Sequence, residues 1–127
     1  MSRFEHCIPI LSVRNVAASI RYYVDKLGFK KHWDWGDPPT FGAVSRDNVE
    51  IYFCQGTQGQ PGTWLYIAVA DVDALYEQFT SNGVEIRQPP TNLAWQMREI
   101  NVADPDGHII RFGTPTSARP DGTLRED

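Results

Sequence analysis

The sequence predicts an α+β fold made of two copies of one strand–helix–three-strand (βαβββ) module, whose sheets form a cup within a single domain. Three observations predict it. Apolar residues recur at two-residue steps in short runs and at three- and four-residue steps in two longer ones. The order of these runs is the same in both halves of the chain. The segments VRNV (13–16) and VADV (69–72) match at an offset of 56 positions, each at the start of a predicted helix.

The first module begins with a β-branched and leucine-rich run, Cys7–Val13, which is typical of a strand. Asn15 is a good N-cap, and apolar residues at helical spacing follow it as far as Leu27. Gly28 then ends the helix. Three further strands are expected over residues 29–35, 40–45 and 49–54, the last two joined by a tight turn at 46–48.

The second module repeats this order after a glycine-rich linker. A strand over residues 64–69 precedes Asp71, which caps a helix that ends at Gly83. Strands are expected over 84–87, 94–102 and 108–112. The domain therefore spans residues 1–113, with modules at about 6–54 and 63–113, a linker at 55–62 and a polar C-terminal tail at 114–127.

Composition and charge narrow the class of partner. The chain has 127 residues and a net charge of −4, so it lacks the basic surface that nucleic acid or an anionic membrane would need. No run approaches 18 apolar residues, and the first residues lack a signal-peptide pattern. With only two cysteines, the expectation is a cytoplasmic protein with reduced thiols and no membrane or nucleic-acid partner.

The sheet faces that the helices leave uncovered carry aromatic and charged residues. Alternation along the strands places Glu50 with Tyr52, Trp64 with Tyr66, and Ile109 with Arg111 on these faces. The strand at 29–35 contributes either Trp33 with Trp35 or His32 with Asp34. Such a surface suits a flat, partly cationic organic ligand. The predicted ligand-binding residues are Trp33, Trp35, Phe41, Glu50, Tyr52, Trp64, Tyr66, Trp95 and Arg111.

Two alternatives stay open at this point. The rings can instead fill a closed core, and the charges can serve structure. In that case Arg111 pairs with Glu50, with Glu99 or across a dimer contact. The modules themselves can pair within one chain or across a dimer, because the linker permits both.

The chain resembles the vicinal-oxygen-chelate superfamily of glyoxalases, extradiol dioxygenases and bleomycin-resistance proteins. The likeness covers roughly residues 6–113 and rests on VRNVAASIRYYVDKLGF (13–29), VADVDALYEQF (69–79) and DPDGHIIRF (104–112). Bleomycin-resistance proteins are the most similar members, through IPILSVRNVAASIRYY (8–23), FGAVSRDNVEIYF (41–53) and AWQMREINVADPDGHIIRFG (94–113).

The resemblance implies that the metal site of the superfamily's enzymes is absent. Its four ligand positions fall on Ile8, Glu50, Trp64 and Arg111, of which only Glu50 can bind a metal and Arg111 is a cation. His6, His32 and His108 are expected at the surface or rim, and no His-x-His or Cys-x-x-Cys spacing occurs. We therefore expect no metal, no cofactor and no catalytic residue.

The closer likeness implies a homodimer that sequesters an aromatic antibiotic or metabolite in clefts at its interface. Trp33, Phe41, Tyr66 and Trp95 match cleft aromatics of the family. His32 replaces an acidic position of that cleft, which weakens the match to bleomycin itself, and Arg111 can select an anionic ligand instead. The alternatives are a lyase, isomerase or dioxygenase of the same superfamily with a relocated metal, and a relative with a structural or regulatory role.

Overall fold

The chain folds as two modules with the same order of elements, each a four-stranded sheet with one helix. The structure, a computed structural model, describes residues 2–116. The first module contains β1 (Ile10–Ser12), α1 (Val16–Asp25), β2 (Lys30–Gly36), β3 (Pro39–Arg46) and β4 (Val49–Cys54). The second contains β5 (Trp64–Ala68), α2 (Val72–Ser81), β6 (Ile86–Asn92), β7 (Met97–Ala103) and β8 (Ile109–Pro115).

The predicted internal repeat and the α+β class are confirmed. The strand order is β1-β4-β3-β2 in one sheet and β5-β8-β7-β6 in the other. In each module the first strand pairs in parallel with the last, and the remaining pairs are antiparallel. The two compact units divide between Pro61 and Gly62, inside the predicted linker.

Each helix begins at the residue that the sequence predicts. Asn15 Oδ1 accepts a hydrogen bond from the backbone N–H of Ala18 at 2.9 Å, and Asp71 Oδ1 accepts one from Ala74 at 3.1 Å. These bonds satisfy N–H groups that the first helical turn leaves unpaired. A second side chain from the module's last strand or just after it completes each cap. The N–H of Val16 donates to Gln55, and that of Val72 donates to Thr114.

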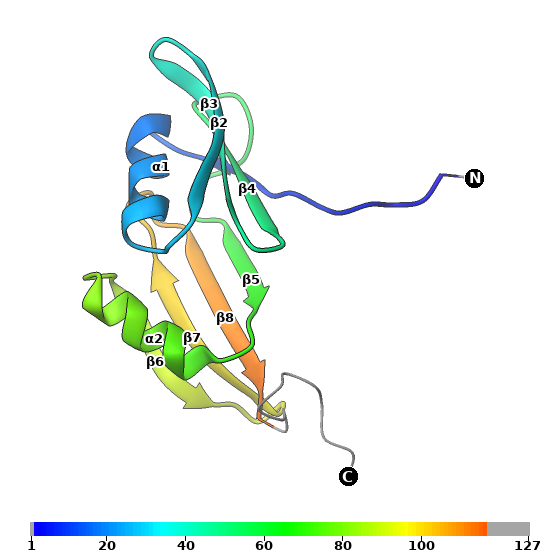
Figure 1. Ribbon diagram of the computed structural model, residues 1–127, viewed down its shortest axis with the longest axis vertical. Coiled ribbons are helices and arrows are strands. Elements are labelled where there is room, and N and C mark those ends of the chain that lie inside the picture. Colours follow the sequence, from blue (N-terminus) through cyan, green and yellow to red (C-terminus); the bar gives the residue numbers. More distant parts are fainter. Residues whose placement is uncertain (1, 117–127) are drawn as a thin grey trace. The chain divides into compact units, whose positions relative to one another are not determined.

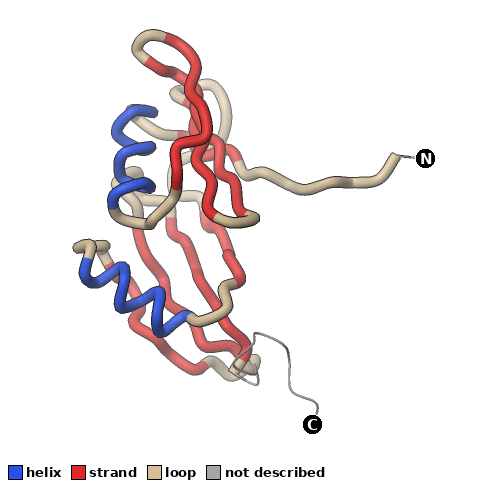
Figure 2. Tube along the Cα trace, in the orientation of Figure 1, coloured by secondary structure: helices blue, strands red, loops and turns tan. Residues whose placement is uncertain are grey.

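The helix of each module packs on one face of its own sheet, as Figures 1 and 2 show for α1 and α2. On the helix side of the first sheet, the Tyr23 ring contacts the rings of Phe29 and Phe53. Gly42 of β3 lies under α1, where an added Cβ would come within 2.9 Å of the side chains of Val16 and Ile20. The opposite face of each sheet is free of helices, and the candidate residues lie there.

A bulge in β2 determines which side chains reach that opposite face. Lys31 pairs with Val44, but Trp33 pairs with Ala43, so one extra residue, His32, is inserted on β2. Without it, the two-residue period would turn Trp33 toward the helix, because Val44 packs on that side. The structure therefore selects the Trp33 and Trp35 pair of the two alternatives open for this strand.

Several strand boundaries differ from the sequence prediction. β1 is shorter at its start, since Pro9 has no N–H to donate. β6 runs on through Pro89 and Pro90, which an edge strand tolerates. β7 starts late because Leu93–Gln96 form a turn in which Gln96 has a φ of 67°.

The prediction of a tail from residue 114 onward is wrong for its first two residues. β8 continues to Pro115, and the Thr114 hydroxyl donates to the carbonyl of Val69 at 2.9 Å. Residues 117–127 of the predicted tail lie outside the described residues.

The prediction that His108 lies at the surface is also wrong. Its side chain is fully buried, and its Nδ1 accepts a hydrogen bond from the N–H of Thr63 at 3.0 Å. His108 lies just before β8, at the same parity as Ile110 and Phe112, so it points to the core side. It was correctly placed on the opposite side from Arg111.

Membrane-spanning helices are not among the elements that residues 2–116 form. Both helices have ten residues, and neither is long and apolar enough to cross a bilayer.

We predict that Asn15→Ala and Asp71→Ala each lower the free energy of unfolding by about 1 kcal/mol, because each removes a helix cap. Chemical denaturation followed by tryptophan fluorescence measures the loss. Asn15→Asp, which keeps a cap acceptor, should stay close to the wild type. Equal losses in Asn15→Asp and Asn15→Ala would contradict the role of the cap.

Candidate functional site

The first module presents a cluster of three aromatic rings on its helix-free face. The Trp33 and Phe41 rings stack with centroids 5.4 Å apart and planes within 7°. The Tyr52 ring meets both nearly edge-on, with centroids at 5.1 Å from Trp33 and 5.7 Å from Phe41. Strands β2, β3 and β4 each supply one ring, so the sheet fixes their spacing. The result is an ordered aromatic surface of the kind that binds flat molecules.

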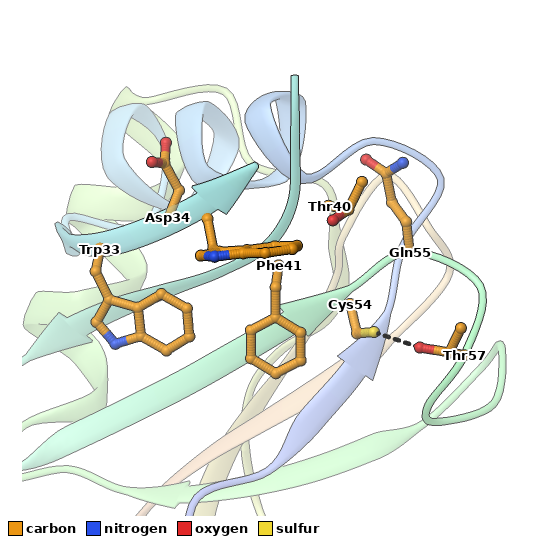
Figure 3. Close-up of a pocket in the computed structure, with 8 residues that line it drawn as sticks. Trp33, Asp34, Thr40, Phe41, Cys54, Gln55 and Thr57 are labelled. Atoms are coloured by element: carbon orange, nitrogen blue, oxygen red, sulfur yellow. Dashed lines mark hydrogen bonds between the residues drawn. The ribbon is translucent and has the colours of Figure 1, made fainter. Parts of the chain in front are cut away.

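A pocket of about 730 Å³ lies beside this cluster. It is lined by Trp33, Asp34, Trp35, Thr40, Phe41, Cys54, Gln55 and Thr57. Figure 3 shows the Trp33 and Phe41 rings side by side on one side of β2, with the Asp34 carboxylate on the other. Asp34 pairs there with Lys31 at 2.8 Å. The Asp34 carboxylate is therefore not aimed at a molecule on the rings.

The acidic group on the ring side is Glu50. It lies two residues before Tyr52 on β4, and its Oε2 is hydrogen-bonded to Nδ1 of His32, the residue inserted by the bulge. The described contact of Glu50 is thus with His32 in its own module, a pairing that the sequence did not predict. This carboxylate provides the negative charge next to the aromatic cluster.

The second module places three candidate residues around one buried carboxylate, that of Glu99. Arg111 donates to Glu99 Oε1 through Nε at 3.1 Å and Nη2 at 2.6 Å. Glu99 Oε2 accepts from the Tyr66 hydroxyl at 3.3 Å and from Trp95 Nε1 at 3.2 Å. Arg111 also lies over the Tyr66 ring, 5.2 Å from its centroid. Arg111 therefore pairs with Glu99, one of the predicted alternatives.

Glycine at position 113 makes this arrangement possible. Gly113 pairs with Glu99 across β7 and β8 and with Ala68 across β5 and β8. A Cβ on Gly113 would lie 2.0 Å from the Tyr66 hydroxyl oxygen and 3.2 Å from Glu99 Cγ. The Tyr66 ring can thus lean over the strand toward Glu99 only because residue 113 has no side chain.

The network shifts the pKa values of two of its members. Burial favours a higher pKa for Glu99, but hydrogen bonds from Arg111, Trp95 and Tyr66, with the charge of Arg111, lower it below its usual value. Burial, the charge of Glu99 and the hydrogen bond to Glu99 together raise the pKa of Tyr66, against the smaller effect of Arg111. Glu99 is therefore charged and Tyr66 neutral near neutral pH.

The structure brings the predicted residues together in two groups, one in each module. Trp33, Phe41 and Tyr52 are in mutual contact, with Trp35 at the same pocket. In the other module Tyr66, Trp95 and Arg111 meet at Glu99, and Trp64 is exposed two residues before Tyr66 on β5.

Glu99 is the functional residue that sequence reasoning did not place in the site. The sequence predicts it only as a possible partner of Arg111. A signal was available, because Ile100 and Val102 are the core residues of their strand, so Glu99 must point to the face of Arg111.

Metal-ligating side chains do not cluster in the part of the chain that the structure describes. Within residues 2–116, no three side chains of histidine, cysteine, aspartate or glutamate gather closely enough to hold a metal ion. At two of the superfamily's four ligand positions, Glu50 contacts His32 and Arg111 contacts Glu99. The absence of a metal stays a prediction.

Comparison with known proteins identifies relatives that cover most of the chain. Residues 3–112 match the family described as the glyoxalase/bleomycin resistance protein/dioxygenase superfamily. A bleomycin resistance protein from Geobacillus stearothermophilus is 30% identical over 128 residues, covering 83% of this chain and 92% of the relative.

Two solved structures illustrate the likeness in three dimensions. A bleomycin-binding protein from Streptomyces verticillus, in complex with copper(II)-bleomycin, has a TM-score of 0.72 at 30% identity and covers 88% of this chain and 97% of that one. TioX from Micromonospora sp. ML1 has a TM-score of 0.77 at 18% identity, over 87% and 98% of the two chains. The second of these shows a shared fold alone.

We predict that Glu99 stabilises the folded protein near neutral pH and that this stabilisation is lost in acid. Because the folded state lowers its pKa, the stabilising contribution of Glu99 is complete above the unfolded value of about 4.3 and is lost as the pH falls through the folded pKa. The wild type should therefore exceed Glu99→Gln in unfolding free energy near pH 7, and the difference should shrink near about pH 3. Urea denaturation at both pH values measures this. Glu85→Gln, which removes an exposed carboxylate, is the control, and a Glu99→Gln difference that does not change with pH would contradict the assignment.

Proposed function

Because the chain belongs to the glyoxalase/bleomycin resistance protein/dioxygenase superfamily, we propose that it is a binding protein that sequesters an aromatic antibiotic of the bleomycin type. The proposal is supported by relatives named for bleomycin resistance at 30% identity and by a structural neighbour that holds copper(II)-bleomycin. Such a protein acts by binding alone and needs no reaction step.

The observation that carries the proposal is the exposure of large aromatic side chains on the helix-free sheet faces. Among residues 2–116, the exposed large apolar side chains are Phe4 and four predicted ligand-binding residues, namely Trp35 (71% exposed), Trp64 (62%), Tyr66 (45%) and Trp95 (60%). A closed core would bury these rings, so their exposure argues against that alternative. Ordered aromatic surface left open to solvent typically marks a binding site.

The chemistry of the first module suits a flat group that carries positive charge. The stacked Trp33 and Phe41 rings offer a surface for a planar heteroaromatic group beside the pocket. Glu50 lies on the same face and supplies a counter-charge, shared with His32. A cation held over these rings gains from both the ring faces and the carboxylate.

We predict that the purified protein binds bleomycin in isothermal titration calorimetry, in the metal-free or the copper-loaded form. Trp33→Ala and Tyr66→Ala should each weaken binding by at least about tenfold, the order expected for an anchoring aromatic residue. Tyr76→Ala, which removes a ring from α2 on the helix side of its sheet, is the matched control and should bind like the wild type.

Growth of bacteria that express the chain tests sequestration directly. The wild type should raise the bleomycin concentration that cells tolerate, and Trp33→Ala should not. Absence of binding heat for both forms of the drug would contradict the proposal for bleomycin. Stoichiometric metal together with substrate turnover would contradict a purely binding role.

The proposed binding unit is a homodimer, as the resemblance implies. Light scattering coupled to size exclusion should therefore give twice the mass of the chain at micromolar concentration. Bleomycin binding at a stoichiometry of one drug per chain by a monomer would contradict the dimeric cleft while leaving drug binding intact.

A further inference from the structure

The surface of the second module differs in charge from that of the first. Its exposed rings are those of Trp64, Tyr66 and Trp95, and the last two contact an ion pair between Arg111 and Glu99. One member of this pair is a cation and the other an anion, so the pair carries no net charge. The Glu99 side chain is 2% exposed, whereas that of Arg111 is 33% exposed. A molecule that settles on this surface therefore meets Arg111 and not Glu99.

The hydrogen-bonding capacity of the pair is unevenly used. Both oxygens of Glu99 accept bonds, Oε1 from Arg111 and Oε2 from Tyr66 and Trp95. Arg111 uses Nε and Nη2 toward Glu99, and its Nη1 has no hydrogen-bond partner among residues 2–116. A guanidinium presents five N–H donors in a fixed plane, so Arg111 keeps donors for a ligand. Its charge, however, is already balanced by Glu99.

The neighbour of Arg111 on β7 offers an acceptor. Asn101 pairs directly with Arg111 across β7 and β8, on the same sheet face. Its Nδ2 donates to Gln88 Oε1 at 3.2 Å, but its Oδ1 is buried and has no partner in the described part of the chain. Unpaired buried oxygens are uncommon in folded proteins. After rotation of the Asn101 amide, this oxygen would accept a hydrogen bond from a group placed beside Arg111.

We propose that the second module carries a binding surface for an uncharged planar group that bears a carboxamide, with Arg111 as its donor and Glu99 as the residue that positions Arg111 and the rings. The carboxamide oxygen accepts a hydrogen bond from Arg111, and the carboxamide N–H donates one to Asn101 Oδ1. A carboxylate suits the site less, because it has no donor for Asn101 and gains little from a guanidinium that Glu99 already neutralises.

The inference rests on the proposed function only in taking this face to bind a small molecule. It narrows that function by assigning to the second module the part of the ligand that it binds, a planar group with a carboxamide. It also decides against the anionic ligand that Arg111 suggests when its sequence position is considered alone.

Two probes of the same shape test the assignment, 2-naphthamide and 2-naphthoate. Each is titrated into the full chain while the indole N–H resonance of Trp95, assigned with Trp95→Phe, is followed by NMR. The wild type should bind the amide more tightly than the carboxylate, on the order of tenfold, because only the amide has an N–H to donate to Asn101. Wild-type protein that prefers the carboxylate, or a Trp95 resonance that responds to neither probe, would overturn the proposal.

Glu99→Gln separates positioning from mere structural support. This variant removes the negative charge and leaves Arg111 unbalanced, so the preference should invert in favour of naphthoate. A purely structural role would weaken both probes alike, and that result would overturn the positioning role. Asp73→Asn is the matched control. It breaks the exposed Arg98–Asp73 ion pair of the same module, with Nε–Oδ2 at 3.0 Å, and should leave the preference unchanged.

A second variant keeps the test decisive if Glu99→Gln does not fold. Arg111→Met removes the donor to the carboxamide oxygen, so it should weaken the binding of 2-naphthamide at Trp95 by about tenfold. Unchanged affinity for the amide would overturn the proposal. Titration of the same samples with bleomycin distinguishes a failure of this inference from a failure of the proposed function. Drug binding without an amide preference contradicts the present inference alone, whereas amide binding at Trp95 without drug binding contradicts the proposed function alone.

Discussion

The surface of the second module depends on the hydrogen bonds that the buried carboxylate of Glu99 accepts. A buried carboxylate without partners would be strongly unfavourable, and here all four hydrogen bonds come from side chains that also reach the surface. Tyr66 and Trp95 are thus held by their polar edges while their ring faces stay exposed. Gly113 is required for the same reason, because any side chain there would displace the Tyr66 hydroxyl. The carboxylate therefore orders rings that would otherwise rotate freely in solvent, and less conformational entropy is lost when a ligand binds.

The two modules use one backbone plan for unlike surfaces. Each helix covers one side of its sheet and leaves the other side open, so the open sides are equivalent positions in the repeat. The first module fills its side with the stacked Trp33 and Phe41 rings and keeps an acidic group at Glu50. The second combines exposed rings with a neutral ion pair. The two surfaces therefore suit different chemical groups, a cationic flat group on the first module and an uncharged hydrogen-bonding group on the second.

The fold was largely predictable because short sequence patterns, such as helix caps and alternating apolar residues, occur in the same order in both modules. Asn15 and Asp71 are caps that act within one helical turn, and both helices begin where these residues place them. The side chains that face the site were less predictable. The bulge at His32 depends on the pairing of β2 with β3, and no local residue preference reveals it. The burial of His108 and the role of Glu99 depend on partners far along the chain, Thr63 for the first and Tyr66 for the second. Sequence alternation reports the face of a strand but not which polar residues will meet there.

A crystal structure of the chain grown with copper(II)-bleomycin is the most direct test of whether the helix-free faces of the two sheets bind the ligand. Drug atoms should contact the Trp33 and Phe41 rings on the sheet of the first module or the Tyr66 and Trp95 rings on that of the second. Drug bound on the α1 and α2 sides of the sheets, with these four rings still open to solvent, would contradict this expectation.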